Sequence, residues 1–353
     1  MRPPHVPHGA QVVSVASVPR WTFLAGSLLL ALFVFYCFWP LTRYFFSQDD
    51  FYFLEKASAG LRAVTAPHFN AHPGHFRPVT MGLYFLVMWP LFGLYPLPYH
   101  VVSLALHALN AILAGVLLRR LGISRFASWI AALLFAANVG ELEAVAWVSC
   151  VQQLLGATFT LVALIRGVDA LGTRGRAPVV GASVAYALAL GSYEQTLAIP
   201  LVLMLWEWIH RGWRAALRAC AGPLLPMWIL LGAYLVYVLG IRGLPASGPY
   251  QMWLGAHVWE NFREYTGSVF AVWLIYPYLD LPTGLRGSHI VWWTLIAWYA
   301  WRRKPKDLAF GCAAFVLFLL PVLFMRYHVF SFHLYIPAIG ALYLLAGAAD
   351  SAV

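Results

Sequence analysis

The sequence alternates between long apolar runs and short polar or basic stretches over its whole length. The apolar runs are about 15 to 22 residues long, and a helix needs about 20 such residues to cross a bilayer. The pattern predicts an all-α, polytopic integral membrane protein. The first run, Trp21 to Phe38, is long enough to span and has no small-residue cleavage site. We therefore expect it to remain as a helix and not to be removed as a signal peptide.

Basic residues gather in short clusters between the apolar runs, as they do on the cytoplasmic side of membrane proteins. The clusters are Arg119, Arg120 and Arg125; Arg166, Arg174 and Arg176; Arg211, Arg214 and Arg218; and Arg302, Arg303, Lys304 and Lys306. Placing them all inside predicts about ten spans. The expected spans are 21–39, 98–118, 126–138, 144–165, 178–191, 196–210, 220–240, 289–301, 308–324 and 334–349.

This topology predicts one transmembrane domain over residues 1–353, with residues 1–20 as a cytoplasmic tail. Two long segments, 40–97 and 241–288, are expected outside. The first contains the apolar stretch 79–95 and the second the apolar stretch 259–279. If either stretch crossed the membrane, a basic cluster would lie outside and not on the cytoplasmic side. We expect these two stretches to be helices lying in the outer interface.

The composition agrees with a membrane protein, and the placement of the charges disfavours one class of function. The chain is 62% hydrophobic and only 10% charged, with a formal net charge of +10. Because the basic residues mark the ends of apolar runs, we interpret the charge as a topology signal and disfavour binding to nucleic acid. The high Arg content favours a bacterial protein, and we expect it in the cytoplasmic (inner) membrane.

The scarce acidic residues fall mainly on the predicted outer side, and two of them are adjacent. The chain has 13 Asp and Glu residues, and Asp49-Asp50 follows the first predicted span. Neighbouring carboxylates raise the pKa of one of the pair, which suits a general base. The alternative interpretation is a helix cap or an interface anchor. Carboxylates at span ends favour chemistry at the outer membrane–water boundary, whereas a pump or channel more often carries them within its spans.

Several ordered motifs resemble one enzyme superfamily. They are Ser47-Gln48-Asp49-Asp50, Phe76-Arg77-Pro78-Val79, Pro98-Tyr99-His100 with His107 and Asn110, Glu143 to Ser149, Ser192-Tyr193-Glu194-Gln195, Leu320-Pro321-Val322 and Leu334-Tyr335-Ile336-Pro337. Over residues 40 to 345 the chain resembles the GT-C glycosyltransferases, and most of all the membrane half of the TPR-bearing transmembrane O-mannosyltransferases and their bacterial relatives. It departs from the usual family strings at 138–143, at Val151 and Gln153, and at 331–333.

The resemblance implies a polyprenyl-phosphate-linked sugar as donor and Asp49 or Asp50 as the catalytic base. We expect one carboxylate to take the proton of an acceptor hydroxyl as that hydroxyl attacks the anomeric carbon of the sugar. A single base needs no covalent intermediate, so inversion at that carbon is expected.

Other polar residues are candidates for positioning the substrates. Those for the acceptor or donor sugar are Glu141, Glu143, Glu194, His75 and His107, and those for the donor phosphate are Arg77, Arg326 and His333. A guanidinium donates two parallel hydrogen bonds to phosphate. Each residue also has a plain interpretation: solvated or capping carboxylates, a hydrogen-bonded packing histidine at 107, and arginines held by lipid headgroups.

The sequence leaves the cofactor and the partners open. His68, His72 and His75 have a spacing that would place them on one face of a helix, but Pro67 and Pro73 disfavour a regular helix there, so no metal site is predicted although a divalent metal is compatible. Expected partners are the polyprenyl-phosphate lipid, membrane lipids, an unidentified acceptor and, as an option, a membrane partner subunit. The rival functions are an inactive scaffold or lipid-handling subunit and a transporter of lipid-linked saccharides.

Overall fold

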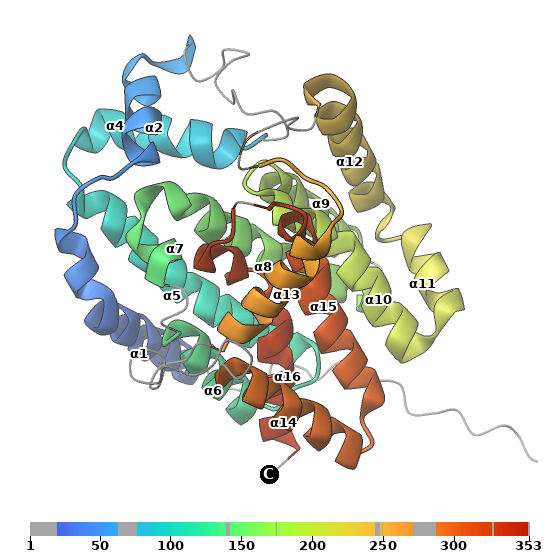
Figure 1. Ribbon diagram of the computed structural model, residues 1–353. Helices are drawn as coiled ribbons and strands as arrows, with labels where there is room; N and C mark the ends of the chain where they lie inside the picture. Colours follow the sequence, from blue (N-terminus) through green and yellow to red (C-terminus); the bar gives the residue numbers. More distant parts are fainter. Residues whose placement is uncertain are drawn as a thin grey trace, which may run out of the picture.

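The computed structural model describes residues 20–62, 76–138, 142–173, 175–243, 248, 250–270, 287–326 and 328–351. Their regular structure is helical (Figure 1), apart from an isolated antiparallel bridge between Met252 and Met325. This confirms the all-α prediction. Several of the helices are long and apolar, as expected for an integral membrane protein.

The helices follow one another with short connections. The α-helices are α1 (Arg20–Phe38), α2 (Asp49–Ser58), α4 (Phe85–Phe92), α5 (Leu97–Arg120), α6 (Arg125–Ala136), α7 (Leu142–Ala146), α8 (Val151–Thr173), α9 (Arg176–Leu190), α10 (Ile199–Arg211), α11 (Trp213–Cys220), α12 (Leu225–Leu235), α13 (Ala256–Ser268), α14 (Gly287–Trp301), α15 (Pro305–Leu323) and α16 (Ala338–Asp350). The 3-10 helices are η2 (Trp39–Arg43), η5 (Val148–Cys150), η6 (Glu194–Ala198) and η8 (Ser331–Leu334), and η3 (Pro78–Tyr84) and η7 (Val236–Arg242) are π-helices.

Fewer helices are long enough to cross a membrane than the ten spans predicted. The candidates among the described residues are Trp21–Arg43, Leu97–Arg120, Val148–Thr173 and Pro305–Leu323, with a fifth if Trp213–Cys220 and Leu225–Ile241 form one span bent by 69°. Other apolar helices are shorter: α6 has 12 residues, α16 has 13 and α9 has 15. At 1.5 Å per residue these helices are about 18 to 23 Å long, less than the roughly 30 Å hydrocarbon core of a bilayer.

The two predicted interfacial stretches are helical where the structure describes them. The stretch 79–95 forms η3, which continues into α4 and ends at Gly93. The first part of 259–279 belongs to α13, and residues 271–286 lie outside the described part of the chain. Pro78 begins η3, where its missing N–H is tolerated, and Pro90 lies inside α4, where it removes one helix hydrogen bond.

Polar contacts join the helix ends at which the basic clusters lie. We call this end of the helix bundle the basic end. The contacts are Arg125–Thr22, Arg120–Asp169, Ser124–Asp350, His210–Asp307 and Arg302–Ser351. They bring together the beginnings of α1, α6 and α15 and the ends of α5, α8, α10, α14 and α16. The grouping agrees with the prediction that these clusters share one side. Helix α5, with 24 residues, extends about 36 Å from there toward α2 and α4 (Figure 1).

Helices α15 and α16 approach closely through two glycines. A Cβ added at Gly340 would lie 2.5 Å from the backbone nitrogen of Phe315 and 2.7 Å from the carbonyl oxygen of Gly311. Both neighbours are backbone atoms, which cannot turn away as a side chain does. The two helices must therefore separate to admit even one methyl group.

We expect Gly340→Ala to lower the free energy of unfolding by about 1 to 3 kcal/mol, the usual cost of overpacking. Thermal unfolding of the purified protein in detergent measures this. The matched control is Gly232→Ala in α12, where a Cβ meets nothing within 4 Å. That variant should be neutral or slightly more stable because alanine favours a helix. An equal loss in both variants would contradict the proposed close approach.

Candidate active site

The structure separates the two adjacent aspartates into a buried and an exposed carboxylate. Asp50 is 1% exposed, and its Oδ1 accepts hydrogen bonds from the backbone nitrogen (2.7 Å) and the hydroxyl of Ser149. Its Oδ2 accepts from the backbone nitrogen of Ser47 at 2.9 Å. Asp49 is exposed, and within the described residues its carboxylate receives no hydrogen bond. Asp50 is therefore held in place, while the carboxylate of Asp49 is accessible to a ligand.

Local backbone geometry fixes this arrangement. Gln48, just before the pair, has φ 45° and ψ −115°, a conformation that residues other than glycine rarely adopt. The two aspartates then begin α2, where the helix dipole favours negative charge. Burial raises the pKa of Asp50, the hydrogen bonds from Ser149 and Ser47 oppose that rise, and the charge of Asp49 adds to it.

Arg77 and Glu194 form a largely buried ion pair in the same region. Nε of Arg77 donates to both carboxylate oxygens of Glu194, at 2.8 and 2.9 Å, and Nη2 donates to Oε2 at 2.6 Å. Nη1 donates to the amide oxygen of Gln152 in α8. The guanidinium also lies 4.7 Å from the ring centre of Tyr193. Arg77 is thus neutralised by a protein carboxylate, which the sequence did not predict for a residue expected to hold a phosphate.

His333 continues this cluster from the other side of Tyr193. Its Nδ1 is hydrogen-bonded to the hydroxyl of Tyr193 at 2.6 Å, and the two rings are nearly parallel, at 8°. The amide of Gln195 donates to the carbonyl oxygen of His333 at 2.8 Å. These contacts connect η8 to η6, so His333 belongs to the same polar cluster as Arg77 and Glu194.

Glu143 lies in α7 and accepts a hydrogen bond from the hydroxyl of Ser331 at 2.6 Å. The following Trp147 donates from its indole nitrogen to the carbonyl oxygen of Ser47 at 3.4 Å. Ser331 begins η8, which carries His333, and Ser47 precedes the aspartates. Glu143 is therefore connected through short segments both to the aspartates and to the His333 cluster.

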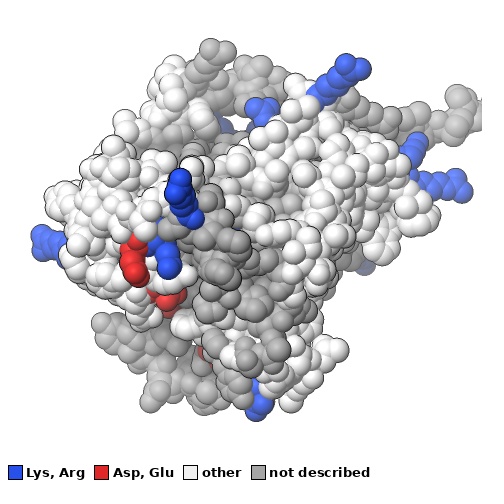
Figure 2. Space-filling model, turned by 90° about the horizontal axis from the view of Figure 1, so that it is seen from above, with Lys and Arg blue, Asp and Glu red and all other residues white. Residues whose placement is uncertain are grey.

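The exposed aspartate and the buried ion pair both act electrostatically on Tyr250. Burial raises the pKa of Tyr250, the charge of Arg77 lowers it, and the charges of Asp49 and Glu194 raise it. All three charges therefore lie within electrostatic range of one phenol. Seen from the end where α2 and α4 lie, a few acidic side chains gather near basic ones on a largely uncharged surface (Figure 2).

The remaining predicted residues are not joined to this cluster by the contacts above, or they fall outside the described chain. His107 is buried inside α5, where its ring nitrogens contact the hydroxyl of Tyr335 (2.7 Å) and the carbonyl oxygen of Ala136 (3.2 Å). This arrangement matches the alternative interpretation of His107 as a hydrogen-bonded packing residue. Arg326 is exposed, 5.5 Å from the ring centre of Trp253. His75 and Glu141, like His68 and His72, fall outside the described residues.

Sequence reasoning gave no role of their own to four residues whose hydrogen bonds hold the cluster together. They are Ser149, Gln152, Tyr193 and Ser331. One signal for the first two was present: Ser149 and Gln152 interrupt an apolar run that was assigned to a single span at 144–165. In the structure this run breaks between α7 and α8. Ser149, in η5 at the break, donates to Asp50, and Gln152, at the start of α8, accepts from Arg77.

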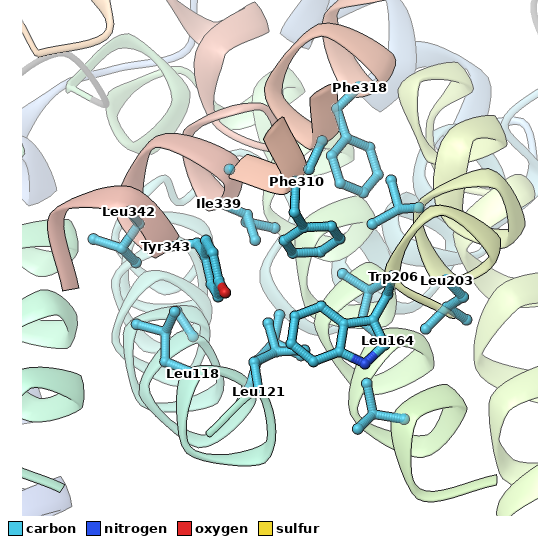
Figure 3. A pocket seen from close by; sticks show the side chains of 16 residues that line it. Leu118, Leu121, Leu164, Leu203, Trp206, Phe310, Phe318, Ile339, Leu342 and Tyr343 are labelled. Carbon is cyan, nitrogen blue, oxygen red and sulfur yellow. The ribbon is translucent and has the colours of Figure 1, made fainter. Parts of the chain in front are cut away.

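The described residues show no metal cluster at this site, and an apolar cavity lies away from it. In the parts of the chain that the structure describes, no three or more His, Cys, Asp or Glu residues are grouped to hold a metal ion. A cavity of about 30 Å³ lies instead between α5, α8, α10, α15 and α16, bounded by apolar side chains that include Leu118, Trp206 and Phe310 (Figure 3). That volume is about that of one water molecule, too small for a sugar or a lipid chain.

His328, next to this cluster, predicts a pH dependence of stability. Burial and the positive charge of Arg77 lower its pKa to about 4. Below the pKa of an unfolded histidine, about 6.5, the unfolded chain binds a proton that the folded chain does not, so stability falls as the pH drops from about 6.5 to 4.

We expect His328→Gln to flatten that pH dependence. Melting temperatures measured across this pH range for both proteins test it. Parallel curves for wild type and variant would contradict the assignment to His328.

Comparison of the chain with protein-family models, with curated proteins and with solved structures finds no match.

Proposed function

We propose that this chain is an integral membrane glycosyltransferase. It would transfer a sugar from a polyprenyl-phosphate-linked donor to an acceptor outside the cytoplasmic membrane of a bacterium, with Asp49 as the general base. The observation that carries the proposal is the asymmetry of the aspartate pair: Asp50 is anchored by Ser149 and Ser47, while Asp49 is exposed beside it. A general base must be accessible to its substrate, as Asp49 is, and the hydrogen bonds of Asp50 fix the start of the helix that carries it.

The reaction needs one new bond, one broken bond and one proton transfer. The acceptor hydroxyl oxygen attacks the anomeric carbon and forms the new glycosidic bond. The bond from that carbon to the phosphate oxygen breaks, and the lipid phosphate leaves with the electron pair. Asp49 takes the hydroxyl proton. No atom beyond those of the two substrates is required.

Two further groups support a role in substrate positioning. Glu143 is partly exposed and connected to the aspartate segment through Trp147, so it suits hydrogen bonding to sugar or acceptor hydroxyls. For the donor phosphate, Arg326 is the better candidate because it is an exposed residue two positions before His328, whereas Arg77 is buried against Glu194. Arg77, Glu194 and His333 then have a structural role beneath the substrates.

The topology proposed for this enzyme has about ten spans, with the short helices α6, α9 and α16 crossing alongside the longer ones. One observation supports an even number: the beginning of α1 and the end of α16 both contact the basic end, through Thr22 and Asp350. With that end inside, the positive-inside rule places Asp49 at the outer boundary.

The test is sugar transfer by the purified protein in liposomes. Polyprenyl-phosphate donors carrying different radiolabelled sugars would be supplied together with peptide, lipid and glycan acceptors from a bacterial envelope. We expect label to move to one acceptor class with release of polyprenyl phosphate. No transfer from any donor would favour the scaffold, and passage of an intact lipid-linked sugar across the bilayer would favour the transporter.

A further inference from the structure

Helix α11 has a sharply two-sided surface at the basic end of the bundle. Trp213, Arg214, Leu217 and Arg218 are all exposed, while Ala216 and Ala219 are buried on the opposite side. Trp213 is 60% and Leu217 is 47% exposed. Residues four apart lie on the same side of a helix, so the outer surface consists of an apolar stripe and an adjoining arginine stripe.

The chain turns sharply at both ends of α11, so this helix does not extend its neighbours. It leaves α10 through Gly212, whose φ of +87° is readily adopted only by glycine. It meets α12 at an angle of 69°. If Leu225–Ile241 crosses the bilayer, a helix bent by 69° from it lies close to the membrane plane, and Figure 1 shows α11 at the periphery.

The arginines of α11 differ from others at the basic end in their partners. Arg120 pairs with Asp169, Arg125 donates to Thr22, and Arg302 donates to the carbonyl oxygen of Ser351. Arg214 and Arg218 have no carboxylate partner among the described residues, and the one hydrogen bond from Arg218 goes to the carbonyl oxygen of Arg214 in its own helix. Their charges are therefore available to an external anion.

We propose that α11 is an interfacial helix that binds anionic phospholipid headgroups on the side of the basic end. Trp213 and Leu217 enter the boundary between headgroups and acyl chains, and Arg214 and Arg218 pair with lipid phosphates. A tryptophan at this depth has an apolar ring in the lipid and an indole N–H in the polar layer. This role is independent of the proposed sugar transfer.

The test is quenching of tryptophan fluorescence by brominated lipids. The protein is reconstituted in phosphatidylcholine vesicles with a minor fraction of brominated phosphatidylglycerol or, at equal fraction, brominated phosphatidylcholine. The chain has 16 Trp residues, so the contribution of Trp213 is taken as the difference between wild type and Trp213→Phe. We expect this contribution to be quenched more strongly by the anionic lipid.

The double variant Arg214→Gln/Arg218→Gln identifies the groups responsible. One basic side chain near an anionic surface contributes about a fivefold preference, the equivalent of about 1 kcal/mol. We expect the double variant to lose a lipid preference of at least about fivefold, and wild type to lose it near 1 M salt, where the Debye length is about 3 Å. The control is Arg302→Gln, because that arginine is already bound to Ser351.

Three results would overturn the proposal. Equal quenching of Trp213 by both lipids would remove the preference for anionic headgroups, and a preference that survives in the double variant would assign it to other residues. Absence of any Trp213 quenching would place α11 outside the bilayer. Unchanged melting temperatures of the variants show that the fold is intact.

Discussion

Asp49→Asn is expected to lower the rate of sugar transfer by about 100- to 10,000-fold, the usual contribution of a general base. Asparagine has nearly the same shape as aspartate but cannot accept the hydroxyl proton. Because Asp49 is exposed and makes no hydrogen bond through its carboxylate with the described residues, its replacement should leave the fold unchanged. The measurement is kcat with the polyprenyl-phosphate donor in liposomes, with the melting temperature recorded alongside.

Two variants on α2 provide the controls. Glu55→Gln removes an exposed carboxylate from the same helix and should retain a rate near that of wild type. Asp50→Asn should act on stability, with a loss of about 1 to 3 kcal/mol, because an amide N–H₂ would face N–H donors from Ser47 or Ser149. If Asp50→Asn lost more activity per folded molecule than Asp49→Asn, the assignment of the base would be reversed.

This division of labour between the aspartates was not predictable from sequence. The pair was recognised because acidic residues are scarce, but which member is buried depends on Ser149, which lies 99 residues further along the chain. Only the packing of η5 against α2 brings these residues together. Gln48 carries no sequence signal for positive φ either, since glycine or asparagine is the usual residue there.

The apolar runs correctly predicted where helices lie, but not which helices are long enough to cross a membrane. Each of the ten predicted spans contains a helix, because a run of leucine, alanine and phenylalanine favours one in any apolar surrounding. Apolarity does not fix helix length, however. The run at 144–165 breaks at Trp147, and α6 ends at Ala136, followed by Ala137 and Asn138. Helix α2 was missed because its ten residues mix charged and aromatic side chains without an extended apolar run.

The expected role of Arg77 shows a different limit of sequence reasoning. An arginine near predicted outer carboxylates suggested a phosphate ligand, and its motif supported that. Its actual partner, Glu194, is 117 residues away in the sequence. Arg77 had been expected to bind the donor phosphate, and Glu194 to position a substrate. Sequence reasoning placed both side chains on the outer side, but their mutual neutralisation depends on η3 packing beside α8 and η6.

Breaking this pair is expected to cause the largest loss of stability. Glu194→Gln keeps the shape of the side chain but leaves the 95% buried Arg77 without a counter-charge, at a cost of about 3 to 5 kcal/mol. Replacing both residues by methionine removes the uncompensated charge and should recover much of that loss. Thermal unfolding of Arg77→Met, Glu194→Met and the double methionine variant gives the coupling energy between the two positions.

The matched control is the pair of Arg166 and Asp169, in which the arginine side chain is 55% exposed and the charged atoms are 3.9 Å apart. Arg166→Gln should cost less than about 1 kcal/mol, since water screens such a pair. If Glu194→Gln unfolded at the wild-type temperature, Arg77 would not depend on Glu194 for its charge balance. Its guanidinium would then be available to an anionic ligand, and the phosphate-binding role would return from Arg326 to Arg77.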